Sequence, residues 1–244
     1  PPRSTLFPYT TLFRSIKATF FTLGILAENE KELLAEIIDY GHEIACHGYN
    51  HKCVYTLTPD EFRKDIEKAA VAIEKAVGMY PRGFRAPNFS INKKNEWAFL
   101  ILKELGFIYD SSIQPFGIHP GYGDSSYPLK PFVHVSGIIE LPLSCSSFWG
   151  LRIPCAGGAY FRHYPYFLFR YLFKRSILQT GFSIFYFHPW ELNNDTRPYE
   201  VNGIKRYRKY HNSAIAESLL NKLMNEFVFV PMDVLLRNML KYEN

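Results

Sequence analysis

The stretch IACHGYNH, residues 44–51, places a short apolar strand directly before two histidines, His47 and His51, four positions apart. Four residues is about one helical turn, so if the segment coils, both imidazoles project from the same side and can hold one metal ion. Imidazole is the commonest metal ligand at neutral pH and suits zinc and its first-row neighbours. The alternative is a pair of surface or capping histidines, and the rest of the chain decides between the two interpretations.

The composition is that of a globular protein. The chain has 244 residues, of which 47% are hydrophobic and 21% charged, which suits one large α/β domain and argues against disorder. The formal net charge is +5, and the basic residues are dispersed apart from KRYRK, residues 205–209. We interpret that cluster as a solvated basic face, with a phosphate or an acidic glycan as the alternative, and we expect no nucleic-acid partner.

The four cysteines form no CxxC pair and no disulfide-like framework; they are Cys46, Cys53, Cys145 and Cys155. Reduced thiols favour a reducing compartment, and we therefore expect a cytoplasmic location. No apolar run approaches the length of a membrane span. The sequence leaves the oligomeric state open.

Residues 5–15, TLFPYTTLFRS, resemble the translation of a common sequencing-library adapter. The alternative is an ordinary strand rich in Thr and Phe. We expect residues 1–15 to be a non-native artefact segment, native sequence to begin near Ile16, and whatever preceded it to be lost. Such segments are left out of fold reasoning.

Strand-like and helix-like segments alternate from residue 16 onward. Strands are expected at residues 17–23, 44–46, 83–84, 107–109, 138–143, 182–187 and 227–230. Helices are expected at residues 28–40, 59–77, 93–105, 165–179 and 214–225 and at the C-terminus. This alternation implies an α/β fold with a mainly parallel sheet, either open or closed into a barrel. Residues 114–160, rich in Gly, Pro and Ser, suit a substrate-facing insertion.

Polar residues follow four of the expected strands: His47, Arg85, Asp110 and His188. Barrel enzymes gather their chemistry at the C-terminal ends of the strands. The sequence therefore predicts that these residues belong to a single active site.

Six stretches resemble, in this order, motifs of one known family: KATFF, GHEIACHGYNH, FRAPNFSI, GFIYDSSI, GGAYFR and FHPWE. The family is the polysaccharide deacetylases of the NodB-homology type, carbohydrate esterase family 4. The resemblance is closest to the subgroup linked to bacterial exopolysaccharide and exosortase gene clusters. It implies a distorted (β/α) barrel, with a deacetylase domain and C-terminal extension over residues 16–244.

The resemblance also implies a metal-dependent hydrolase that removes N-acetyl groups from an amino-sugar polysaccharide. His47 and His51 would bind a divalent ion, with zinc expected first and cobalt or nickel as alternatives. The ion would polarise the acetyl carbonyl and activate a water molecule. Arg85 would orient a base aspartate, with a surface salt bridge as the alternative role.

Four further residues receive roles from the same resemblance. His188 would protonate the leaving amine, or else be a hydrogen-bonded structural histidine. Asp110 would help to set the pKa of His188, or else cap a strand end through an Asx turn. Trp190 would wall the sugar site or only pack. Tyr49 would meet the substrate or only shape the turn.

One family motif is absent from the chain. A TFDD- or TFDVED-like strand end, expected upstream of KATFF, supplies both the metal-binding aspartate and the base aspartate. The first acidic residue of this chain is Glu28, which with Glu30 looks like a helix-start residue. Two histidines without a carboxylate leave an ion short of ligands. We therefore expect the first barrel strand to be missing and the polypeptide as given to be inactive or nearly so.

Two other functions stay open at this stage. One is a non-catalytic glycan-binding module on the same scaffold, although such a module has little use for Arg85 and His188. The other is a hydrolase of another non-peptide C–N bond, such as that of a cyclic ureide. The long irregular region and the aromatic content of 17% favour a glycan substrate. The sequence argues against a zinc peptidase of the HExxH type, because no Glu follows His47.

Overall fold

A computed structural model describes residues 16–117, 123–192 and 211–242. The expected artefact segment, residues 1–15, and the basic cluster at 205–209 lie outside these residues. The chain divides into two compact units. The first unit contains residues 1–112, 133–140 and 227–244, and the second contains residues 113–132 and 141–226. Each unit is described by itself.

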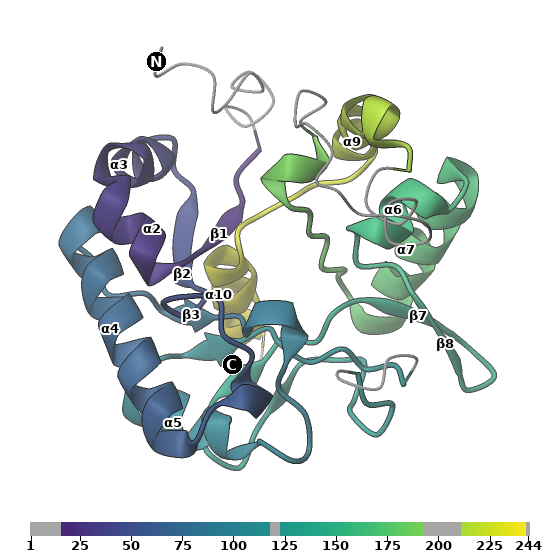
Figure 1. The fold of residues 1–244 in the computed structure, drawn as a ribbon. Helices are drawn as coiled ribbons and strands as arrows, with labels where there is room; N and C mark the ends of the chain where they lie inside the picture. The colour runs from purple at the N-terminus through teal and green to yellow at the C-terminus, as the bar shows by residue number, and fades with distance from the viewer. Residues whose placement is uncertain (1–15, 118–122, 193–210, 243–244) are drawn as a thin grey trace. The chain divides into compact units, whose positions relative to one another are not determined.

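The central element is a sheet of six described strands in the order β1-β2-β3-β4-β6-β5 (Figure 1). The strands are β1 (Thr19–Thr22), β2 (Glu43–Cys46), β3 (Gly83–Phe84), β4 (Tyr109–Asp110), β5 (Phe132–Val133) and β6 (Ile139–Glu140). The pairings from β1 through β4 to β6 are all parallel. The prediction of an α/β fold with a mainly parallel sheet is therefore confirmed. Closure into a barrel is not seen among the described strands.

Helices of the first unit pack beside this sheet, and Figure 1 shows α2, α4 and α5 in a row on one side of it. The helices are α2 (Gly24–Asn29), α3 (Lys31–Asp39), α4 (Pro59–Val77), α5 (Trp97–Glu104) and α10 (Met232–Tyr242), with the short 3₁₀ turns η1 (Val54–Thr56) and η2 (Pro87–Phe89). The capping box expected before α4 is present, because Thr58 Oγ1 accepts from Glu61 N and Glu61 Oε2 accepts from Thr58 N. Gly78 ends the helix at φ +74°, a left-handed conformation that glycine adopts without strain.

The single helix predicted over residues 28–40 is wrong. The chain forms α2 and α3 instead, broken at Glu30, whose φ of −129° and ψ of 50° are not helical. Helix α2 begins at Gly24, earlier than predicted, because of a tertiary contact. The amides of Gly24 and Ile25 donate to the carbonyls of Gly48 and Tyr49, in the loop of residues 47–51. The expected strand at 227–230 is also wrong, because these residues form no strand and Val228 is 95% exposed.

Gly83 lies where β3 passes Tyr109 of the neighbouring strand. A Cβ at residue 83 would come within 2.0 Å of the Tyr109 ring. The ring is fully buried and its hydroxyl donates to Glu43 Oε1 at 2.8 Å, so it has no room to move aside. We expect Gly83→Ala to destabilise the protein by about 3 kcal/mol, the upper range for overpacking, measured by urea unfolding. Gly117→Ala is the control, since a Cβ there meets only Ser125 Oγ at 3.8 Å. Equal stability of the two variants would contradict this account.

The second unit combines a hairpin with helices. Its elements are the antiparallel strands β7 (Cys145–Phe148) and β8 (Leu151–Pro154), the helices α6 (Ala159–His163), α7 (Tyr166–Thr180) and α9 (Ser213–Glu226), and the 3₁₀ turn η3 (Pro189–Glu191). Four phenylalanine rings form its aromatic core in edge-to-face and stacked contacts: Phe161, Phe169, Phe173 and Phe185.

The buried strand predicted at residues 182–187 is wrong. Only Ile184 of this run is buried, and the run makes one isolated bridge, between Tyr186 and Gly157. Its backbone bonds go to a loop: Tyr186 N donates to Ala156 O, and Tyr186 O accepts from Gly158 N. The apolar run therefore packs its rings against α6 and α7 without joining the sheet.

Candidate metal centre and active site

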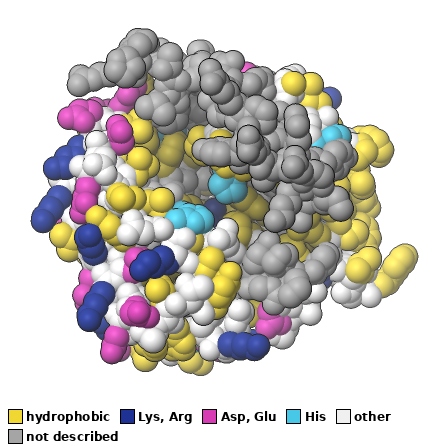
Figure 2. Space-filling model, in the orientation of Figure 1, with side chains coloured by type: hydrophobic (Ala, Val, Ile, Leu, Met, Phe, Trp, Pro, Cys, Tyr) yellow, Lys and Arg dark blue, Asp and Glu magenta, His cyan; other side chains and the backbone are white. Residues whose placement is uncertain are grey.

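His47 and His51 lie side by side in the first unit, with ring centroids 5.1 Å apart. They belong to the ligand loop, residues 47–51, which follows β2 directly. The loop is not helical, so the helical-turn explanation of their proximity is wrong. His47 is partly buried at the strand end, and His51 is exposed. Figure 2 shows histidine side chains at the surface that faces the viewer in the orientation of Figure 1.

The hydrogen bonds of His47 determine which ring nitrogen can bind a metal ion. Its Nδ1 lies 2.7 Å from the carbonyl oxygen of Arg85. A carbonyl oxygen only accepts, so Nδ1 carries the proton and Nε2 keeps the lone pair. The backbone amide of His47 donates to Thr22 O at 2.9 Å, which fixes the residue to β1. This is the way metal-binding histidines are usually oriented by their surroundings.

Three non-glycine residues of this region have a left-handed backbone: His51 at φ 58°, Asn88 at φ 55° and Phe89 at φ 54°. This conformation is uncommon for side chains with a Cβ, and strained residues cluster at functional sites. His51 is one of the two predicted ligands, and the other two residues belong to η2, just after Arg85. The left-handed turn at His51, rather than a helix, returns its ring to that of His47.

The ligand loop is held by two helices. The amides of Gly24 and Ile25, at the start of α2, donate to the carbonyls of Gly48 at 2.9 Å and Tyr49 at 3.2 Å. From α4, Asp65 Oδ2 accepts from the amide of Tyr49 at 2.8 Å. A Cβ at Gly24 would lie 2.7 Å from the backbone of Ala69, so this approach of α2 to α4 needs glycine. The loop is therefore fixed by backbone contacts before any ligand is considered.

Tyr49 faces the helices rather than open solvent. It is 8% exposed, and its hydroxyl donates to Glu28 Oε2 at 2.6 Å. Lys68 Nζ lies 3.6 Å from its ring centroid, in cation–π geometry. These contacts give Tyr49 a role in shaping the turn, the alternative weighed from the sequence. Contact with a substrate stays a prediction.

Arg85 joins the ligand loop to the end of β4. Its carbonyl accepts from His47, while its side chain donates from Nε to Ser111 O at 2.9 Å and from an Nη to Ser111 Oγ at 2.8 Å. The guanidinium also lies 4.1 Å from the centroid of the Phe21 ring. Arg85 is 7% exposed. It is a buried, fully oriented cation beside the predicted metal ligands, and not a surface salt bridge.

Asp110 and Glu140 form a buried carboxyl pair at the ends of β4 and β6, where they are register partners. Both are fully buried, and their side chains share a hydrogen bond. Two carboxyl groups can share a hydrogen bond only when one of them holds a proton. Burial favours the protonated form as well, because it raises the pKa of Asp110. Asp110 also accepts from Ser112 N at 2.9 Å and Ser112 Oγ at 2.7 Å, the Asx-turn geometry that was its alternative role.

His188 and Trp190 lie in the second unit, so their place in one site with the histidine pair stays a prediction. His188 precedes η3, its side chain is 52% exposed, and its Nδ1 lies 3.2 Å from Glu191 Oε1. The Trp190 ring stacks on it, with centroids 5.6 Å apart and planes inclined by 21°. Glu191 in turn lies 3.7 Å from Arg162, and both are almost fully buried.

Sequence reasoning gave no role to Asp65, Glu140, Glu191 or Arg162. Asp65 and Arg162 act through contacts distant in sequence, between Asp65 and Tyr49 and between Arg162 and Glu191. Glu191 had a local signal, because it stands three residues after His188 with a proline between them. That spacing suits a short turn that brings a carboxylate back to an imidazole.

A cluster of three or more metal-ligating side chains is not found in the part of the chain that the structure describes. Cys46, next to His47, is fully buried, and burial raises its pKa to about 12, so it stays a thiol. The two imidazoles are suitable ligands for a divalent ion, but they do not complete its coordination. They supply two nitrogen donors, and a third protein donor is not among the described residues.

Two family models match adjoining parts of the chain. Residues 13–109 match the model "Polysaccharide deacetylase", and residues 111–237, more than half of the chain, match "Domain of unknown function (DUF3473)". The junction between them falls close to residue 112, where the first unit gives way to the second. The chain belongs to the family of the second model, DUF3473, and its residues 13–109 are similar to polysaccharide deacetylases.

Relatives agree with this assignment. A peptidoglycan deacetylase-like protein of Gibberella zeae is 34% identical over 113 residues, 46% of this chain and 32% of that protein. A peptidoglycan deacetylase of Helicobacter pylori is 36% identical over 115 residues, 45% of this chain and 38% of that protein. The matches thus span about a third of these relatives' lengths. A solved candidate polysaccharide deacetylase from Mycobacterium smegmatis shares the fold, with a TM-score of 0.60 and 19% identity over 94% of this chain and 74% of that chain.

Proposed function

We propose that the protein is a metal-dependent hydrolase that removes N-acetyl groups from an amino-sugar polysaccharide. One observation supports this more than any other. The ring centroids of His47 and His51 lie 5.1 Å apart, and the bond from His47 Nδ1 to the Arg85 carbonyl leaves Nε2 of His47 to coordinate a metal ion. Similarity to peptidoglycan deacetylases adds the substrate class. We propose zinc as the ion, with cobalt or nickel as alternatives. Its chemistry would be to polarise the acetyl carbonyl and to lower the pKa of a bound water.

The chain's own residues would contribute positioning and proton transfer. Arg85 presents a buried positive charge, fixed by Ser111, that can orient a base carboxylate. His188 can hold a proton on Nε2 and give it to the leaving amine, whose nitrogen takes the electron pair of the broken C–N bond. A third metal-ligating side chain beside the two histidines is not found among the described residues, and the base aspartate that the family resemblance implies has no match in the motifs of this chain. We therefore propose that the polypeptide as given has little or no deacetylase activity.

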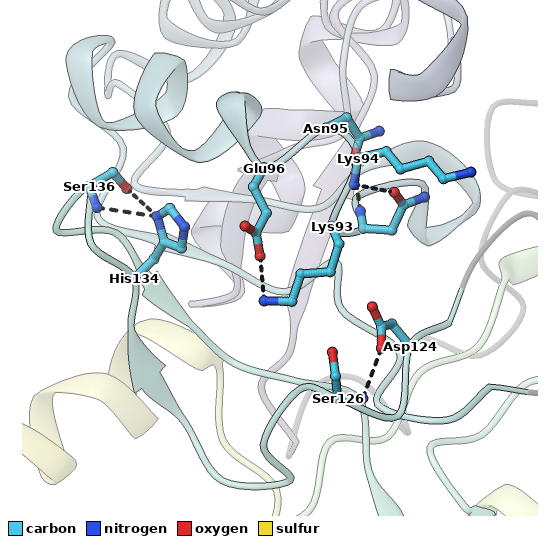
Figure 3. A network of polar contacts seen from close by, with 9 residues as sticks. Lys93, Lys94, Asn95, Glu96, Asp124, Ser126, His134 and Ser136 are labelled. Carbon is cyan, nitrogen blue, oxygen red and sulfur yellow. Dashed lines mark hydrogen bonds and ion pairs between the residues drawn. The ribbon is translucent and has the colours of Figure 1, made fainter.

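Metal affinity tests the histidine pair directly, without reference to activity. We expect the protein to bind Zn²⁺ in competition with a chromophoric chelator, and His47→Ala and His51→Ala each to lower the affinity by roughly 100-fold, since each removes one of two donors. The matched control is His134→Ala. His134 lies elsewhere in the first unit, where it is bonded to Ser136 (Figure 3). Its ring also packs on Phe99. Equal affinity in all four proteins would overturn the metal site.

Activity is then tested on N-acetylglucosamine oligosaccharides. The polypeptide as given is compared with a protein whose residues 1–15 are replaced by the sequence that the gene encodes upstream of Ile16. We expect acetate release only from the second protein, because the family resemblance implies an aspartate pair upstream of Lys17. An upstream sequence without an acidic pair would contradict the proposal. Oligosaccharide binding that survives His47→Ala and His51→Ala, without acetate release, would instead indicate a glycan-binding module.

A further inference from the structure

We propose that Glu191, locked in place by Arg162, is the positioning residue that fixes the His188 ring and decides which of its nitrogens carries the exchangeable proton. This inference rests on the proposed role of His188 in protonating the leaving amine. It assigns to Glu191 a role that the family resemblance gave to Asp110. All residues that carry it lie in the second unit.

The contact between His188 and Glu191 is built into the start of η3. Pro189 opens this turn, and the Glu191 amide donates to the His188 carbonyl at 2.9 Å. The same turn brings Glu191 Oε1 to 3.2 Å from His188 Nδ1. Glu191 is 4% exposed, whereas the His188 side chain is 52% exposed. A buried carboxylate thus contacts one nitrogen of an imidazole whose side chain is about half exposed.

Arg162 explains how a carboxylate can be buried at residue 191. Its guanidinium lies 3.7 Å from Glu191 Oε1 and is 5.6 Å from the centroid of the Trp190 ring. Arg162 itself is fixed by donation from Nη1 to the His211 carbonyl at 2.9 Å. An arginine always carries its charge, and a carboxylate paired with it accepts hydrogen bonds and donates none.

An acceptor at Nδ1 determines the tautomer of His188. Since the Glu191 carboxylate accepts, Nδ1 carries a proton in both the neutral and the charged ring. The proton that comes and goes is therefore the one on Nε2, at the solvent-facing edge. Stacking on Trp190 and an edge contact with Tyr186, at 5.9 Å between centroids, hold the ring plane. The same logic orients metal-binding and catalytic histidines through a carboxylate partner.

Asp110 has other partners. Its two carboxyl oxygens accept from the amide and hydroxyl of Ser112, and its side chain bonds to Glu140. It is also fully buried in the first unit. These bonds account for Asp110 as a strand-end cap and as half of a carboxyl pair. Within the described part of the second unit, His188 contacts Glu191.

The tautomer of His188 is measured directly by ¹⁵N NMR of the histidine rings, at a pH where the ring is neutral. The original full chain is compared with variants at residue 191. We expect an Nδ1–H ring at His188 in the original protein and in Glu191→Gln, whose amide oxygen still accepts. In Glu191→Leu we expect a shift toward the Nε2–H form that dominates in free histidine. Glu226→Leu is the matched control, because it removes a carboxylate from the exposed pair with Arg170 in the same unit.

A folding defect in Glu191→Leu does not end the test. The double variant Arg162→Met/Glu191→Leu removes both buried charges together, and we expect it to fold and to show the same tautomer shift. An Nδ1–H ring that persists in either leucine variant would overturn the inference. In an active full-length enzyme we expect Glu191→Leu to lower kcat by roughly 10- to 100-fold with little change in KM. Unchanged kcat in His188→Ala would instead overturn the proposed function while leaving the tautomer result intact.

Discussion

Replacing Arg162 with methionine is expected to lower the free energy of unfolding of the second unit by about 3–5 kcal/mol. Arg162 is 1% exposed and its partner Glu191 is 4% exposed, so the variant leaves a carboxylate buried without its cation. The donor to the His211 carbonyl is lost as well. Urea unfolding followed by tryptophan fluorescence measures the effect, because Trp149 and Trp190 both belong to this unit.

The double variant Arg162→Met/Glu191→Leu distinguishes two contributions to the free energy of unfolding. One is the cost of a buried charge without a partner, and the other is the net contribution of the ion pair. Replacing both members of a buried ion pair with apolar residues is often neutral or stabilising. We therefore expect the double variant to recover most of the lost stability. Arg170→Met, which breaks an exposed pair with Glu226, is expected to cost far less stability than Arg162→Met. A double variant as unstable as Arg162→Met would show that packing, and not charge, explains the loss.

The second large effect is on the pH dependence of stability, through Asp110. Burial raises the pKa of this carboxyl in the folded protein above its ordinary value of 3.8. Its contribution to stability is therefore complete below the pKa of the unfolded chain and is lost as pH rises through the folded pKa. Each unit of pKa difference corresponds to about 1.4 kcal/mol. We expect the stability of the original protein relative to Asp110→Asn to fall as the pH rises above the ordinary pKa of an aspartate, 3.8.

Urea unfolding of both proteins at a series of pH values measures this difference. Glu140 shares the hydrogen bond, so the observed pKa belongs to the pair, and Glu140→Gln should flatten the curve in the same direction. Glu43 is the control, since burial also raises its pKa but its partners are Thr19 and Tyr109. Glu43→Gln should leave the dependence due to Asp110 in place. A difference that stays constant or grows with pH would contradict a proton-sharing pair.

Local patterns predicted the parts of the fold that are locally determined. The capping box at Thr58 and the terminal glycine at Gly78 marked both ends of α4 correctly, because caps act within a few residues. The strand before His47 and the placement of Arg85 after a strand were also confirmed. The apolar run at 182–187 failed, because a continuous apolar run fits a buried strand and an aromatic core segment equally well.

The site was predictable as residue types but not as geometry. The proximity of His47 and His51 was expected from a helical turn, yet the two rings meet in a loop in which His51 is left-handed and Gly48 and Tyr49 are held by tertiary contacts. The break at Glu30 depends on bonds from α2 to a loop about 20 residues away, which no short-range pattern contains. Similarly, the partner of His188 in this structure is Glu191, a choice that depends on the buried Arg162.

The fixation of the ligand loop by Gly24, Ile25 and Asp65 has a consequence for handling the protein. These bonds are independent of metal, so a chelator would empty the site while the first unit stays folded, unlike a zinc finger, whose fold requires its ion. On the proposed function, the folded apoprotein would then be loaded with one chosen ion at a time. Reconstitution in parallel with Zn²⁺, Co²⁺ or Ni²⁺ can rank these ions on the same preparation, which a fold built around its metal would not allow.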